Sequence, residues 1–326
     1  MIAFIFPGQG SQSVGMGRAL ADAYPEAAAA FAEADAAYAT AAGDEPDEGI
    51  AARSLSEVVF EGPAEELMRT ERAQPAILTM SVAASRVLAG FGVEPAIVAG
   101  HSLGEYSAHV VAGTLTLPEA VATVRRRGRY MQDAVPAGAG AMAAVLGADQ
   151  ALVQQACDEA AEGEVVSPAN INGPGQVVIA GTVSAVARAG QRARALGARR
   201  VIPLSVSAPF HCALMAPAEA RLAPNLRALS ARAPRVPVVA SVDAGLRREA
   251  GPAVEALIRQ VCAPVQWEAV VHRLAREGVT TYVEVGPGTV LGGLVRKIQN
   301  DARILHFGSP GDLGAVVAAC SISAAR

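Results

Sequence analysis

The sequence predicts an α/β fold, in which a mainly parallel sheet carries helices on both faces and a smaller unit is inserted into the chain. Short apolar runs alternate with helix-like stretches in both outer parts of the sequence, a pattern typical of parallel sheets. Between them the order becomes β-α-β-β-α-β, which is the ferredoxin-like arrangement. A third observation is an apolar strand that ends directly in a Gly-x-Ser-x-Gly turn.

The N-terminal part starts with a buried strand at 2–6, which a glycine-containing loop at 7–12 interrupts. This loop lacks the lysine of a phosphate-binding Walker A motif. An Ala-rich stretch follows at 26–52, and we interpret its acidic part at 44–48 as a surface loop. Helices are expected at about 16–24, 55–60, 63–68 and 73–91.

The Gly-x-Ser-x-Gly turn follows the apolar run 96–99, and Gly100 and Gly104 flank Ser102. A helix-like stretch follows from Leu103, so the order is strand, sharp turn, helix. This is the context in which the motif forms a nucleophile elbow. The Leu103 amide would lie at the positive end of the helix, where it can face a developing oxyanion. The alternative is a glycine-bounded turn with an incidental serine.

The remaining chain completes both units. A capping box at Thr116–Glu119 opens a helix to about residue 134. Further strands are expected at 140–146, 165–169, 176–180, 199–204, 237–241 and 280–285, and helices at 148–161, 183–196, 252–261, 266–277 and after Gly288. We therefore predict a large subdomain at 1–137 and 206–307, a small subdomain at 138–205 and a weakly specified C-terminal tail at 308–326.

The composition narrows the classes of protein. Hydrophobic residues make up 52% and charged residues 18%, which suits a globular protein with a sizeable core. The net charge of −4 does not suggest a nucleic-acid binder. No apolar run reaches the length of a membrane span, and the N-terminus resembles a strand rather than a signal peptide. The four cysteines are scattered, so we expect reduced thiols in a cytoplasmic protein.

A serine nucleophile needs a base, and five histidines are available. His211 lies in the proline-bent loop 206–215, between a predicted strand and a helix. Loops at strand ends are where α/β folds place their site residues, so His211 is the preferred candidate. The side chain of His101 is expected to project away from Ser102. For any of these histidines the alternative is a structural role.

Several motifs together resemble the malonyl-CoA:acyl carrier protein transacylases, the stand-alone acyltransferases of fatty acid and polyketide synthesis. The similarity runs in the family's order over roughly residues 2–300. It is carried by the segments 6–12, 100–105, 127–132, 169–181, 209–215, 264–267 and 284–288. The resemblance implies an α/β-hydrolase-like large subdomain that carries a ferredoxin-like small subdomain.

The resemblance also implies roles for individual residues. Ser102 would attack the thioester and His211 would be the base, in a ping-pong reaction through a malonyl-serine ester. A backbone carbonyl orients the histidine in this family, and Gln266 occupies the matching position here. Backbone N–H groups of Gln9 and Leu103 would hold the oxyanion.

Substrate recognition is assigned in the same way. Arg127 matches the family's carboxylate-binding arginine, whose planar guanidinium suits the free carboxylate of malonyl. Phe210 resembles the phenylalanine of malonyl-selective polyketide acyltransferases and would narrow the space beside the malonyl α-carbon. Asn170 and Asn172 are expected to line the substrate channel or, equally, to be turn residues. The remaining arginines of the helix, at 125, 126 and 129, are expected to be solvated or salt-bridged.

The expected partners are malonyl-CoA and an acyl carrier protein, with neither nucleic acid nor membrane. The family is usually monomeric, and no metal or other cofactor is implied. Two alternatives remain open: transfer or editing hydrolysis of a different acyl group, and a non-catalytic docking subunit. The sequence does not distinguish a fatty acid pathway from a polyketide pathway.

Overall fold

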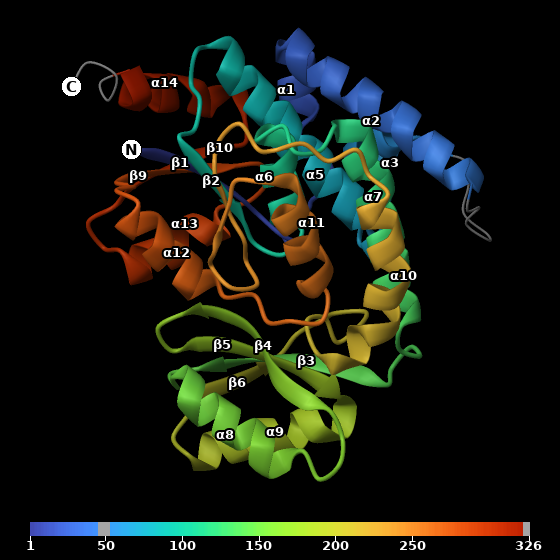
Figure 1. Ribbon diagram of the computed structural model, residues 1–326, viewed down its shortest axis with the longest axis vertical. Coiled ribbons are helices and arrows are strands. Elements are labelled where there is room, and N and C mark those ends of the chain that lie inside the picture. The colour runs from blue at the N-terminus through green and yellow to red at the C-terminus, as the bar shows by residue number, and fades with distance from the viewer. Residues whose placement is uncertain (45–52, 322–326) are drawn as a thin grey trace.

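The computed structural model describes residues 1–44 and 53–321, which form two subdomains around separate sheets (Figure 1). The larger sheet has the strand order β10-β9-β1-β2-β7-β8. Its first five strands are parallel and β8 is antiparallel, so the predicted mainly parallel α/β sheet is confirmed. The strands are β1 (Ile2–Phe6), β2 (Ile97–Gly100), β7 (Val238–Val239), β8 (Leu246–Arg247), β9 (Thr281–Val285) and β10 (Arg303–Phe307).

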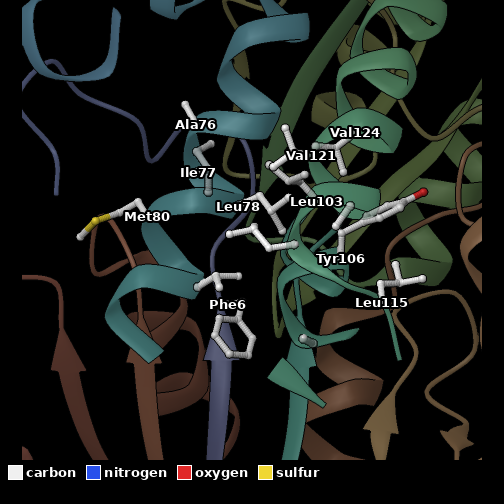
Figure 2. Packing of buried hydrophobic residues seen from close by; sticks show 14 of the residues in the cluster. Phe6, Ala76, Ile77, Leu78, Met80, Leu103, Tyr106, Leu115, Val121 and Val124 are labelled. Carbon is white, nitrogen blue, oxygen red and sulfur yellow. The ribbon is translucent and has the colours of Figure 1, made fainter. Parts of the chain in front are cut away.

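Helices cover both faces of this sheet because alternate residues of β1 point to opposite sides. Phe4 and Phe6 belong to one buried cluster, and Ala3 and Ile5 belong to another. Figure 2 shows part of the first cluster, to which Phe6 and side chains of α5, α6 and α7 all contribute. The first cluster draws on α1 (Arg18–Ala23), α2 (Pro25–Asp44), α3 (Leu55–Glu61), α5 (Thr70–Gly90), α6 (Gly104–Val111), α7 (Leu117–Asp133), α10 (Ala216–Arg227) and α11 (Ala250–Arg259); the second draws on α12 (Trp267–Arg276) and α13 (Val290–Ile298).

The smaller subdomain is an antiparallel sheet with the order β4-β5-β3-β6. Its elements follow one another as β-α-β-β-α-β, so the predicted ferredoxin-like arrangement is confirmed. Helices α8 and α9 lie together on the outer face of this sheet, at the bottom of Figure 1. The elements are β3 (Gly140–Leu146), α8 (Gln150–Ala160), β4 (Val166–Gly173), β5 (Gln176–Thr182), α9 (Val183–Ala195) and β6 (Arg200–Pro203).

Two stretches carry more structure than the sequence predicts. The Ala-rich segment forms the long helix α2, which ends at Asp44; the rest of the predicted acidic loop, 45–48, lies outside the described residues. The predicted C-terminal tail instead contains a 3₁₀ turn (Pro310–Asp312) and helix α14 (Leu313–Ser321), and it follows the additional strand β10. Val316 of α14 is fully buried, so packing against the large core orders this segment.

The apolar residues are buried in three clusters, the third of which lies between the small sheet and its two helices. Among residues 1–44 and 53–321, no helix is both long and apolar enough to cross a membrane.

Candidate active site

The turn after β2 is a nucleophile elbow with close backbone contacts. A Cβ added to Gly100 would lie 1.9 Å from the Gly104 carbonyl carbon, and one added to Gly104 would lie 2.0 Å from the Phe6 oxygen. The predicted reason for both glycines, a close approach of strand and helix, is therefore confirmed. Ser102 itself has φ of 52°, in the left-handed region that non-glycine residues rarely adopt. Such strain in a serine is typical of a functional position.

Ser102 and His211 lie in direct contact although they are far apart in sequence. The distance from Ser102 Oγ to His211 Nε2 is 2.7 Å. His211 Nδ1 lies 2.9 Å from the backbone carbonyl oxygen of Gln260, which can only accept a hydrogen bond. Nδ1 therefore carries the proton, and Nε2 of the neutral ring accepts from the serine hydroxyl. This is the tautomer that a general base requires.

The predicted contact of Gln266 with this histidine is wrong. The Gln266 carbonyl accepts from the Val270 amide (2.9 Å) as the first turn of α12. Gln260 instead follows the last residue of α11, and its carbonyl faces His211. A backbone acceptor has no side-chain signature, so the sequence could not tell which carbonyl between the two helices faces the imidazole.

Burial keeps His211 uncharged at neutral pH. Its side chain is almost fully buried, and burial together with the nearby Arg127 guanidinium lowers the pKa of His211 to about 3. The backbone bond to Gln260 favours the charged form but is the weaker influence. The ring is consequently ready to accept a proton from Ser102 across the physiological pH range.

The predicted oxyanion donors both lie at the site. Gln9 and Leu103 line the same cavity as Ser102. The amides of Gly104 and Glu105 donate to the carbonyls of His101 and Ser102 at 2.9 and 3.1 Å. These bonds occupy the two amides that follow Leu103. The Leu103 N–H directly precedes the first residue of α6, so it lies at the positive end of the helix dipole. The site thus offers an electrostatic environment suited to an oxyanion.

Arg127 places a buried cation beside the nucleophile. Its Nη2 donates to Ser102 Oγ (3.2 Å) and to Gln260 Oε1 (3.0 Å), and its Nη1 donates to Gln74 Oε1 (2.8 Å). The side chain is only 2% exposed, and burial lowers its pKa. It forms no ion pair with the residues that the structure describes. A buried cation held by neutral acceptors is an arrangement that suits an anionic ligand.

Two of the four arginines on helix α7 are buried. The helix begins with the predicted Thr116 capping box. Arg126 and Arg129 are partly exposed. Arg125, expected to be solvated or salt-bridged, is fully buried and lies over the Tyr38 ring at 5.4 Å, with its Nη1 donating to the Ala41 carbonyl. The expected solvation of Arg125 is therefore wrong, because the neighbouring helix α2, which supplies both of these partners, was not predicted.

A cavity of about 470 Å³ lies in front of Ser102, between the two subdomains. Phe210 lines it immediately beside the base, and so does the nearly buried Asn170 from β4 of the small subdomain. Asn172 is not among the described lining residues; its Oδ1 lies 2.8 Å from His101 Nε2 instead. The sequence-predicted site residues therefore gather around one cavity, with two exceptions. Asn172 contacts the lining residue His101, and Gln266 is not among the described lining residues.

Sequence reasoning missed two buried glutamines at this site. Gln74 of α5 is 1% exposed, and Gln260 is fully buried. Each amide oxygen accepts from Arg127. A polar residue inside the apolar stretch 73–84 was a detectable signal for Gln74, because buried amides require partners. Gln260, at the predicted end of a helix, gave no such signal.

An α/β fold with a strained serine hydrogen-bonded to a neutral histidine is typical of enzymes that form acyl-serine intermediates. The sequence matches the acyl transferase domain family over residues 3–304, and the chain belongs to this family. The malonyl CoA-acyl carrier protein transacylase of Escherichia coli (strain K12) is 48% identical over 316 residues, which is 97% of this chain and 98% of that protein. The enzyme of the same name from Bacillus subtilis (strain 168) is 46% identical over 95% of this chain and 94% of its own length.

Solved structures agree with this assignment. An acyl carrier protein S-malonyltransferase from Vibrio cholerae superposes with a TM-score of 0.90 at 45% identity, over 97% of this chain and 99% of that one. A malonyl-transacylase in complex with a type II PKS acyl-carrier protein superposes with a TM-score of 0.91 at 43% identity, over 98% and 99% of the two chains. The resemblance identified from the sequence motifs is confirmed, and with it the α/β fold with a separate antiparallel subdomain.

Proposed function

We propose that this protein transfers a malonyl group from malonyl-CoA to the phosphopantetheine thiol of an acyl carrier protein. The observation that carries the proposal is Arg127, a buried guanidinium whose Nη2 lies 3.2 Å from Ser102 Oγ. A carboxylate bound there would place the acyl carbonyl of a short diacid near the nucleophile. The names of the relatives support the same reaction.

In the first half-reaction Ser102 Oγ attacks the thioester carbon while His211 Nε2 takes the hydroxyl proton. The carbon–oxygen bond forms, and the amides of Gln9 and Leu103 hold the resulting oxyanion. Collapse of this intermediate breaks the carbon–sulfur bond, and His211 returns the proton to the departing CoA thiolate. The product is a malonyl ester of Ser102.

In the second half-reaction the carrier's thiol gives its proton to His211 and attacks the ester carbon. The Ser102 oxygen leaves and recovers the proton, so the enzyme returns to its starting state. No metal or other cofactor takes part in this scheme. The family that the sequence resembles is usually monomeric, so we also propose that the protein acts as a monomer. The four unpaired cysteines support a cytoplasmic location.

The function is tested by mixing the protein with malonyl-CoA and measuring its intact mass. We expect a covalent malonyl adduct on Ser102, which disappears when a phosphopantetheine-bearing acyl carrier protein is added and reappears on that carrier. An adduct formed only by a different acyl-CoA would overturn the substrate. No adduct with any acyl donor would favour a docking subunit instead.

Phe210 should restrict the size of the acyl group. The ring is 9% exposed and lines the cavity next to the base, where a methyl branch on the malonyl α-carbon would meet it. One poorly accommodated methyl group is worth about tenfold or more in kcat/KM. We expect malonyl-CoA to be preferred over methylmalonyl-CoA by about this factor, and Phe210→Ala to reduce the preference while keeping malonyl transfer. Equal rates for both donors in the unmodified protein would disprove the role of the ring.

A further inference from the structure

A buried polar network lies next to the nucleophile, and its residues are not among the described residues that line the cavity. It consists of Glu105 in the first turn of α6, Ser241 after β7 and Gln260 after α11, and all three side chains are fully buried. The proposed reaction involves none of these side chains directly. Their hydrogen bonds nevertheless lead to Arg127.

Glu105 determines the direction of the Gln260 amide. Its Oε2 accepts from the Ser241 amide (3.0 Å), the Ser241 hydroxyl (2.6 Å) and Gln260 Nε2 (2.6 Å). A carboxylate has no proton to give, so Gln260 must present its NH₂ group to Glu105. The backbone carbonyl of Ser102 accepts from the same nitrogen at 3.1 Å and favours the same direction.

With its nitrogen directed to Glu105, Gln260 directs its oxygen to Arg127. Gln260 Oε1 accepts from Arg127 Nη2 at 3.0 Å, and the same Nη2 reaches Ser102 Oγ. A reversed amide would place its NH₂ against the guanidinium, donor against donor. Burial lowers the pKa of Arg127, and the negative charge of the Glu105 carboxylate opposes this effect and favours the protonated guanidinium.

We propose that Glu105 and the side-chain amide of Gln260 are positioning residues, which hold the Arg127 guanidinium in place for the carboxylate of the acyl donor. This inference rests on the proposed malonyl transfer. Gln260 then has two separable roles, because its backbone carbonyl orients His211 while its side chain orients Arg127. A substitution at this position keeps the carbonyl and removes only the amide.

Gln260→Met tests the side chain, since methionine has a similar length but no amide. We expect its kcat/KM for malonyl-CoA to fall at least about tenfold, mainly through KM, the size expected for one lost bond to a charged group. Transfer from acetyl-CoA, which has no carboxylate, should stay within about threefold. Gln260→Asn, which keeps a polar group but is one methylene too short, should change the malonyl-to-acetyl ratio in the same direction and serves if the methionine variant does not fold.

Glu105→Gln tests whether the oxygen at position 105 determines the direction of the Gln260 amide. The amide oxygen of the new residue can accept from the same three donors, and its NH₂ group would take the place of Oε1, which lies 3.9 Å from His109 Nε2. The direction of Gln260 is then kept, so the malonyl-to-acetyl ratio should fall much less than it does in Gln260→Met. Glu105→Met, whose thioether sulfur is only a weak acceptor, should lower the malonyl-to-acetyl ratio as Gln260→Met does.

Gln299→Met is the matched control, because that amide bonds to Tyr282 and Val279, outside the cavity lining. It should not change the ratio. An unchanged ratio in folded Gln260→Met and Gln260→Asn would overturn the proposal, as would a loss of malonyl transfer in Glu105→Gln as large as that in Gln260→Met. The unmodified enzyme separates this inference from the proposed function. If the unmodified enzyme accepts no malonyl group, the proposed function is refuted. If it transfers malonyl and the Gln260 variants keep its malonyl-to-acetyl ratio, only the positioning role is refuted.

Discussion

The His211→Ala variant should form the malonyl adduct on Ser102 about a thousandfold more slowly than the unmodified protein. His211 Nε2 accepts from the serine hydroxyl at 2.7 Å, and a positioned general base contributes about 10²–10⁴ to the rate. Rapid-quench measurement of adduct formation under single-turnover conditions would give the rate. Ser102→Ala is the reference for zero adduct, because it removes the attacking atom. Adduct formation in His211→Ala at the unmodified rate would refute the dyad.

The pH dependence of the same reaction distinguishes a buried base from an exposed one. Burial and Arg127 lower the pKa of His211 to about 3, so Nε2 stays unprotonated well below the ordinary histidine pKa of about 6.5. The acylation rate should therefore remain nearly constant as the pH falls from 8 to 5. An exposed histidine would lose most of its base form over this interval. A rate that falls about tenfold for each pH unit below 6.5 would contradict the lowered pKa.

The fold was predictable wherever short-range patterns decide the structure. Apolar strands, the capping box at Thr116 and the β-α-β-β-α-β order are local signals, and all of them appear in the structure. Helix α2 was missed because alanine gives weak amphipathic contrast, although alanine has the highest helix propensity. The order of the C-terminal segment depends on tertiary burial of Val316, which no local pattern reveals.

The site was predictable where a side chain carries the chemistry. Ser102, His211 and Arg127 each have a recognisable residue type in a recognisable motif, and the structure brings them within hydrogen-bonding distance of one another or of a shared partner. Gln260 was missed because its contact with His211 uses a backbone carbonyl, and because its contact with Glu105 depends on where the fold places the residue after α11. These relations arise from the assembled fold and are absent from the linear pattern.

Arg127→Ala should reverse the preference of the enzyme for acyl donors. The guanidinium is held by Gln74, Gln260 and Ser102 and has no carboxylate partner among the described residues, so a substrate carboxylate would be its counter-ion. Removing one member of a buried charge pair costs about 3 kcal/mol, which corresponds to about a hundredfold in kcat/KM. Malonyl transfer should fall by about this factor, whereas acetyl transfer should rise because the neutral methyl group no longer faces a buried cation.

Arg125→Ala controls for the loss of a buried arginine from the same helix. That side chain is fully buried but lies over Tyr38 and outside the cavity lining, so its removal should lower the melting temperature without changing the malonyl-to-acetyl ratio. Comparing the two variants separates recognition from stability, because only Arg127 reaches the nucleophile. If Arg127→Ala kept the original malonyl preference, or if Arg125→Ala lost it to the same extent, carboxylate recognition by Arg127 would be refuted. If the preference changes only in Arg127→Ala, the choice of acyl group depends on this one cation, and Ser102 and His211 carry out the same chemistry on either donor.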